Sequence, residues 1–179
     1  MFLSLWHRYK EQTNNELNSF AGFAFHLPYT KMGKKALDQI MDEANPKQQI
    51  KLADNLRASQ IFSRDVGNLY TGSVYLSLLS LLSHAKNLKS GDKIAIFSYG
   101  SGAEAELYSV TLQDEFLTGI PAEKTRQLLS KRKKVSVSEY EHIFSSQRFN
   151  SHEDKKTDAS ENATTVQFLG WQNGERIYQ

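Results

Sequence analysis

The chain has 179 residues, of which 39% are hydrophobic and 11% aromatic, a composition that suits a packed globular protein and argues against global disorder. Its formal net charge of +2 is too small to indicate a nucleic-acid partner, and the absence of cysteine excludes disulfides, thiolate metal sites and a cysteine nucleophile within this chain. No run of about 18 apolar residues could span a membrane. Because the first residues turn polar too soon for a signal peptide, we expect a cytoplasmic protein.

The first residues predict an amphipathic helix. Phe2, Leu5, Trp6 and Tyr9 recur at the spacing of one helix face. No residue that could cap this helix precedes Met1. We therefore expect the chain to be a piece of something longer.

A strand and a helix are expected next. The apolar run 21–25 predicts a strand, and Pro28 would stop it. Thr30 can cap a helix that reaches about Ala44. The residues that this helix is expected to bury are Met32, Ala36, Leu37, Ile40 and Met41.

Asn45 and Pro46 have the types preferred at the cap and the first position of a further helix, which would bury Ile50, Ala53 and Leu56. The following segment, 61–67, is interpreted as a connector.

Residues 69–85 predict the most apolar helix of the chain. Its expected buried side consists of Tyr70, Val74, Leu78, Leu81, Leu82 and Ala85, widened by Tyr75 and Leu79.

The stretch 93–112 predicts a strand pair around which the rest is organised. Residues 94–97 are typical of a strand buried on both faces, and residues 103–110 alternate like a strand with two unlike faces. The glycine-rich turn 99–102 joins them. A plain hairpin turn explains the glycines, and close approach of the backbone to a ligand is the alternative.

The C-terminal third predicts a short helix over 121–130 and a second helix over 136–147 that opens with a capping box. The polar stretch 149–162 is interpreted as a surface loop. Residues 164–178 predict a closing hairpin with its turn at 173–174.

His26 is the sharpest candidate for chemistry, because it ends a strand and lies shortly before a helix. An imidazole there can donate to a substrate oxygen or move a proton. A hydrogen-bonded structural histidine is the alternative.

Asn68 and Ser101 are the polar candidates. Asn68 precedes the long apolar helix, where it can cap that helix or direct its amide at a ligand. Ser101 lies between two glycines, either as a turn serine or as part of a carbonyl-binding site.

Lys31, Lys34 and Lys35 gather near the expected helix start, where cations are unfavourable. A bound phosphate would explain them, and a solvated basic face is the alternative. The basic run 131–134 is interpreted as a solvated helix end and not as a nucleic-acid site.

Three strings stand in order: FHLPYTKMGKKAL at 25–37, RDVGNLYTGS at 64–73 and FSYGSG at 97–102. Together they resemble the C-terminal half of 3-hydroxy-3-methylglutaryl-coenzyme A (HMG-CoA) synthase in its bacterial form. The resemblance implies a thiolase-like α/β fold, in which a layered mixed sheet is flanked by helices. Residues 1–179 would form the C-terminal domain, the second of two similar halves.

The resemblance also implies an acyltransferase that condenses acetyl-CoA with acetoacetyl-CoA to HMG-CoA, in the mevalonate route to isoprenoids. Its substrates are coenzyme A thioesters, and no further cofactor or metal is expected. The nucleophilic cysteine and the general-base glutamate belong to the family's N-terminal half, which we expect as a partner, with a homodimer at full length. The isolated chain is therefore expected to be inactive.

Carried over by these strings, His26 would be the catalytic histidine that orients acetoacetyl-CoA and polarises its carbonyl. Asn68 and Ser101 would contact the acetoacetyl group. Lys31, with Lys34 or Lys35, would lie where the family binds coenzyme A phosphates. Two alternatives stay open, another thiolase-fold acyl-condensing enzyme and a non-catalytic binding or assembly module.

Overall fold

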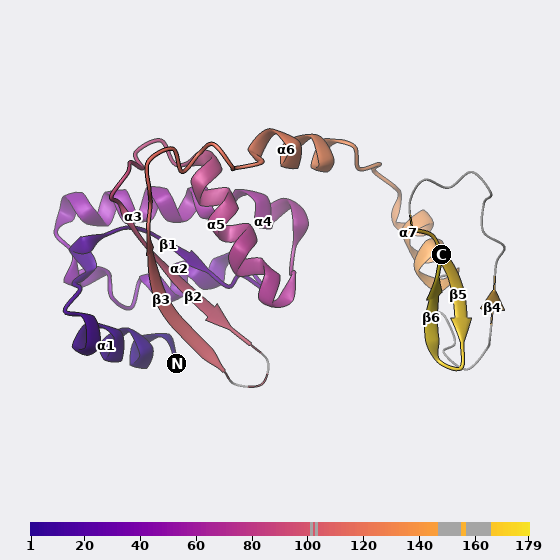
Figure 1. The fold of residues 1–179 in the computed structure, drawn as a ribbon, viewed down its shortest axis with the longest axis horizontal. Coiled ribbons are helices and arrows are strands. Elements are labelled where there is room, and N and C mark those ends of the chain that lie inside the picture. The colour runs from indigo at the N-terminus through magenta and orange to yellow at the C-terminus, as the bar shows by residue number, and fades with distance from the viewer. Residues whose placement is uncertain (101, 103, 147–154, 157–165) are drawn as a thin grey trace. The chain divides into compact units, whose positions relative to one another are not determined.

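The structure, a computed structural model, describes residues 1–100, 102, 104–146, 155–156 and 166–179. The chain divides into two compact units, Met1–Lys131 and Arg132–Gln179, each described by itself (Figure 1). Among the described residues, no helix has both the length and the apolar character needed to cross a membrane. Most of the expected loop 149–162 lies outside the described residues.

A three-stranded mixed sheet forms the centre of the first unit. It consists of β1 (Phe20–Phe25), β2 (Lys93–Tyr99) and β3 (Ala105–Thr111), in that order. β1 runs parallel to β2, and β3 is antiparallel to β2. The expected strand over 21–25 and the expected strand pair are therefore confirmed, as is the α/β class with a mixed sheet.

Helices cover both faces of this sheet (Figure 1). α1 lies on one side and α5 on the other, while α3 contacts both β1 and α5 and adds Leu52 and Leu56 to the core cluster of α1. The helices of the unit are α1 (Phe2–Thr13), α2 (Lys31–Leu37), α3 (Pro46–Ser59), α4 (Ile61–Val66), α5 (Ser73–His84) and α6 (Ala122–Ser130). Three 3-10 turns join them, η1 (Leu17–Ser19), η2 (Met41–Glu43) and η3 (Tyr70–Gly72).

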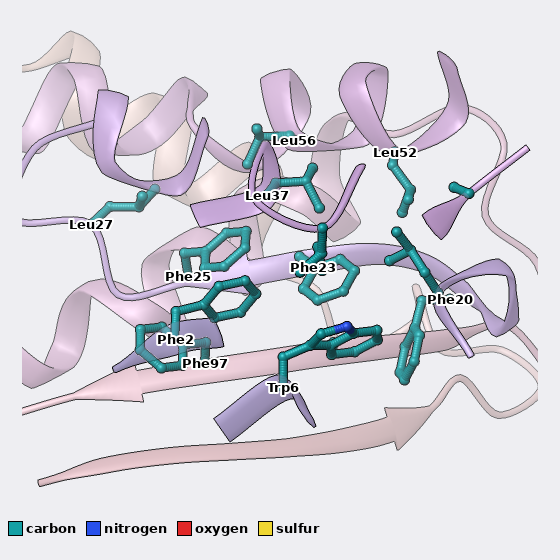
Figure 2. Packing of buried hydrophobic residues seen from close by; sticks show 14 residues of the cluster. Phe2, Trp6, Phe20, Phe23, Phe25, Leu27, Leu37, Leu52, Leu56 and Phe97 are labelled. Carbon is teal, nitrogen blue, oxygen red and sulfur yellow. The ribbon is translucent and has the colours of Figure 1, made fainter. Parts of the chain in front are cut away.

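An aromatic core fills the space between α1 and the sheet (Figure 2). Phe2 and Trp6 of α1 are buried, which confirms the predicted helix face. The ring of Phe2 packs edge-on against Phe97 at 5.2 Å between centroids, and Trp6 packs against Phe20 at 5.7 Å. The Trp6 indole N–H donates to the Glu43 carboxylate at 3.1 Å, so its one polar group is satisfied.

The opposite face of β1 carries small residues. Gly22 and Ala24 are buried there, beside Leu81 and Val74 of α5. A Cβ at Gly22 would lie 3.4 Å from Leu81, an ordinary contact distance. The strand is thus bulky toward α1 and slim toward α5, which lets a helix pack closely on that face.

α2 differs from expectation. It ends at Leu37, before the expected 44, and Thr30 has helical backbone angles and makes no capping hydrogen bond. Met32, expected to be buried, is 45% exposed. Gly33 faces the core instead, because a Cβ there would lie only 3.0 Å from Leu27.

α3 begins as predicted, since the Asn45 side chain accepts a hydrogen bond from the Gln48 N–H at 2.9 Å. The prediction that Ile50 is buried is wrong, because it is 65% exposed. Asn55 of the same helix is buried instead, and its amide donates to the Ala21 carbonyl of β1 at 2.7 Å.

The segment 61–67 was expected as a connector and is instead mostly α4, which ends at Val66 and is followed by Gly67 with a φ of 84°. α5 buries Val74 and Leu81 as predicted, and Leu78, Leu82 and Ala85 pack against the core, but the two tyrosine positions differ from expectation. Tyr70 and Tyr75 are exposed, and the buried positions include Ser73 and Ser77. Small serines let α5 approach its neighbours, which an apolarity count does not register.

The second unit contains α7 (Val137–Ser146), β4 (Lys155–Lys156), β5 (Phe168–Gln172) and β6 (Glu175–Tyr178). The Ser136 hydroxyl accepts from the Glu139 N–H at 3.2 Å, so this cap of the predicted helix is confirmed. β5 and β6 form the predicted hairpin, with positive φ at Asn173 and Gly174. The predicted helix end at Gln147 lies outside the described residues.

We predict that Trp6→Ala lowers the free energy of unfolding by about 3–5 kcal/mol, because it empties a fully buried site of the aromatic core. Ile50→Ala on exposed α3 surface is the matched control, with an expected change within about 0.5 kcal/mol. Urea denaturation of the two variants measures both. Equal losses in the two variants would contradict the assignment of Trp6 to the core.

Candidate functional site

His26 is held directly after β1, at the carboxyl end of the parallel strands. Its backbone N–H donates to the Phe97 carbonyl at 2.8 Å, so the ladder with β2 reaches one residue beyond the strand. Pro28 follows, and cannot continue it. In open α/β sheets this end of parallel strands is where ligands bind.

The His26 ring is fixed by contacts from two elements. Its Nδ1 lies 2.8 Å from the hydroxyl of Ser73, and its ring centroid lies 6.0 Å from that of Tyr99. Burial lowers the pKa of the imidazole below its ordinary value of 6.5, and a backbone hydrogen bond with Tyr70 raises the pKa by less. Burial therefore favours the neutral ring.

Two cavities have His26 in their walls. The first, which we call the Asn68 cavity, measures about 330 Å³ and is lined by His26, Asn68, Tyr70, Tyr99 and Gly100 with Pro28 and Thr71. Its residues come from the ends of β1 and β2 and from the segment before α5. The structure thus brings the predicted residues His26 and Asn68 to one cavity.

The second cavity, which we call the Lys35 cavity, measures about 350 Å³. It shares His26 and Tyr99 with the first, and its walls are largely apolar, with Phe25 and Phe97 among them. Lys35 is its one lysine among the described residues. A chain that is apolar along its length and anionic at one end would suit such walls.

Asn68 is exposed at the rim of its cavity. Its Oδ1 accepts from the Tyr70 N–H at 2.8 Å, so the side chain supports the start of η3 and not that of α5. The carbonyl end is thereby oriented by the backbone. The Nδ2 amide is the end left to donate to a ligand.

The three lysines separate. Lys35 lines a cavity, whereas Lys34 pairs with Asp38 at 2.6 Å on the exposed side of α2. Lys31 is exposed and lines neither cavity. The solvated-face interpretation therefore suits Lys34, and a phosphate contact remains a prediction for Lys31 and Lys35.

Ser101 lies outside the described residues, so its contact with a substrate stays a prediction. Its neighbour Gly100 lines the Asn68 cavity and donates its N–H to the Glu104 carbonyl at 2.9 Å.

Sequence reasoning missed two residues of the site, Ser73 and Tyr99. Ser73 is the last residue of the string 64–73, and Tyr99 is the first residue of the glycine-rich turn 99–102. Both therefore lie within the strings that carry the family resemblance, and this position could have marked them as candidates. Tyr70 was assigned to the core, yet it lines a cavity with a φ of 52°, a rare backbone conformation for a tyrosine. The described residues hold no group of three or more His, Asp or Glu that could bind a metal ion.

We predict that His26 makes the folded chain less stable as the pH falls from about 7.5 to about 5, because the unfolded chain binds this proton more readily. His26→Gln removes the effect. Lowering the pH should therefore reduce the unfolding free energy of the wild type more than that of His26→Gln. Chemical denaturation at both pH values measures it, and a pH-independent difference would contradict the lowered pKa.

Known proteins resemble the chain in sequence and in fold. Residues 46–169 match the family described as hydroxymethylglutaryl-coenzyme A synthase C terminal. A hydroxymethylglutaryl-CoA synthase of Enterococcus faecalis is 41% identical over 143 residues, which cover 80% of this chain and 37% of that protein.

Two solved structures share the fold closely. A protein of Streptococcus mutans UA159 matches with a TM-score of 0.83 at 36% identity. The match covers 99% of this chain and 48% of the Streptococcus mutans chain. An HMG-CoA synthase complexed with CoA matches with a TM-score of 0.82 at 37% identity. This match covers 99% of this chain and 46% of the chain of that synthase. The chain spans less than half the length of these relatives. The matched residues and the identities show that it belongs to the hydroxymethylglutaryl-CoA synthase family and corresponds to its C-terminal region.

Proposed function

We propose that this chain is the C-terminal domain, residues 1–179, of an enzyme that condenses acetyl-CoA with acetoacetyl-CoA to HMG-CoA, the step that feeds the mevalonate route. The observation that carries the proposal is the cavity shared by His26 and Asn68 at the end of the parallel strands. Family membership names the chemistry, and this cavity supplies groups suited to it.

The reaction joins a carbanion, formed on the acetyl group, to the ketone carbon of acetoacetyl-CoA. As the new C–C bond forms, the ketone oxygen gains the electron pair of its C=O bond and must be stabilised and protonated. A neutral His26 can donate a hydrogen bond to this oxygen as its charge develops, and once it passes on its one ring proton it must be reprotonated from solvent. The Asn68 amide would hold the acetoacetyl group in place, and Ser101 would add a third contact.

The carbanion must be made by groups from elsewhere in the enzyme. This chain has no cysteine to carry the acetyl group, and it spans 37% of the Enterococcus faecalis relative. The nucleophilic cysteine and the base glutamate would come from an N-terminal half, within a homodimer. The chain alone is then inactive.

Coenzyme A thioesters serve as substrates, and the relative solved with CoA supports this choice. No further cofactor is part of the proposal. Of the three lysines, Lys35 has the position best suited to a phosphate, because it lines a cavity next to His26. A rat relative named as the cytoplasmic hydroxymethylglutaryl-CoA synthase is consistent with a cytoplasmic location, which we also propose.

In the full-length enzyme, we predict that His26→Ala lowers kcat for condensation by roughly 10²- to 10⁴-fold, because the developing alkoxide loses its proton donor. His7→Ala, which removes an exposed histidine of α1, is the matched control and should leave kcat unchanged. Release of free coenzyme A from acetyl-CoA and acetoacetyl-CoA reports the rate. Near wild-type turnover in His26→Ala would remove the catalytic role.

A second pair of variants separates the lysines. Lys35→Met removes a charge from the cavity wall, so the KM for the coenzyme A thioester should rise roughly 2- to 5-fold with little change in kcat. Lys34→Met removes a charge already paired with Asp38 and should leave KM as it is. If Lys34→Met raises KM as much as Lys35→Met does, the cavity lysine has no special part in binding.

A further inference from the structure

Ser73 is the one side chain for which the described residues record a hydrogen bond to the His26 ring. It comes from the first turn of α5, far along the chain from β1, and it is fully buried. Its Oγ lies 2.8 Å from His26 Nδ1 and also accepts a hydrogen bond from the Leu27 N–H at 3.0 Å. The proposed mechanism assigns Ser73 no part.

The protons of this arrangement can be counted. A serine hydroxyl has one proton to donate and two lone pairs to accept with. The Leu27 N–H occupies one lone pair, and its proton must point at Oγ because a backbone amide cannot reverse its polarity. The hydroxyl proton is then free for Nδ1, the other recorded neighbour of this oxygen among the described residues.

The opposite arrangement would leave a buried donor unpaired. If Nδ1 carried the ring proton, Oγ would accept from both nitrogens, and its own proton would need a third partner inside the core. Buried hydroxyl groups without partners are rare and costly.

We propose that Ser73 is a positioning residue that donates its hydroxyl proton to His26 Nδ1 and so holds the neutral ring in the tautomer with its proton on Nε2. Because Nδ1 is turned toward the buried serine, Nε2 on the other edge of the ring is left for a group in the cavities. His26 would thus meet a substrate oxygen as a donor. The assignment of the tautomer rests on the contacts of Ser73. Its consequence for catalysis rests on the proposed function.

One backbone group competes for the ring, because a hydrogen bond with the Tyr70 backbone raises the pKa of the imidazole, although by less than burial lowers it. Few side chains compete for the ring. Tyr99 from β2 and Tyr70 from η3 line the Asn68 cavity with it, and Lys35 from α2 lines the neighbouring one. No carboxylate lines either cavity among the described residues, so an acidic partner for the imidazole is absent from these walls.

α5 supplies a matched control at Ser77, one turn along the same helix. Ser77 is as fully buried as Ser73, but its hydroxyl has no hydrogen-bond partner within the described part of the chain. Ser73→Ala and Ser77→Ala delete the same atom from the same helix. Only the first deletes a contact with the imidazole, and Ser73→Thr keeps the hydroxyl.

The test is nitrogen-detected NMR of the histidine rings in the full 179-residue chain without substrate, recorded across the titration of His26. Wild type and Ser77→Ala should show a single neutral tautomer with its proton on Nε2 and the same titration midpoint. Ser73→Ala should show a mixture of tautomers and an upward shift of the midpoint, because the neutral ring loses a donor. Ser73→Thr should restore the wild-type signals.

A wild-type ring protonated on Nδ1 would overturn the proposal whether or not any variant folds. So would a Ser73→Ala variant with the wild-type tautomer and midpoint. The experiment needs no turnover, so its result is separate from the activity of His26→Ala. An active His26→Ala enzyme would remove the catalytic role of His26 but not the assignment of its tautomer. A wrong tautomer would likewise leave the catalytic role of His26 untouched.

Discussion

The site depends on the parallel pairing of β1 with β2. This pairing sets Phe25 opposite Phe97, and the next hydrogen bond runs from the His26 N–H to the Phe97 carbonyl. It brings His26 and Tyr99 to the same edge of the sheet, although more than seventy residues separate them. Every contact proposed for the imidazole starts from this fixed backbone position.

Two unlike layers keep β1 in place. On the side of α1, phenylalanines pack against Trp6 (Figure 2). On the side of α5, Gly22 and Ala24 allow close approach of a helix. The close approach matters for function because α5 carries Ser73 to the ring of His26. Packing on the slim face of the strand thus determines which hydroxyl the imidazole meets.

Much of this arrangement could be predicted from local pattern. The apolar face of α1, the strands, the cap at Asn45 and the closing hairpin each follow from spacing or turn chemistry within a few residues. The three strings that carry the family resemblance also contain His26 and Asn68, which the structure places at one cavity.

The errors share a physical cause. Apolar residues were assumed to face inward, but Met32, Ile50 and Tyr75 are exposed, while Gly33 and Ser77 face the core. Where two elements pack closely, a small side chain is favoured over an apolar one, and this depends on the partner element, which the local sequence does not reveal. The contact between Ser73 and His26 is of the same kind, since it joins the start of one element to the end of another.

The most direct measurement is a structure of the full-length enzyme with acetoacetyl-CoA bound. We predict that the ketone oxygen lies within hydrogen-bond distance, about 2.7–3.2 Å, of His26 Nε2, with the Asn68 amide on the same acyl group. An acetoacetyl group bound away from His26, or a His26 ring that turns Nδ1 toward the oxygen, would contradict it.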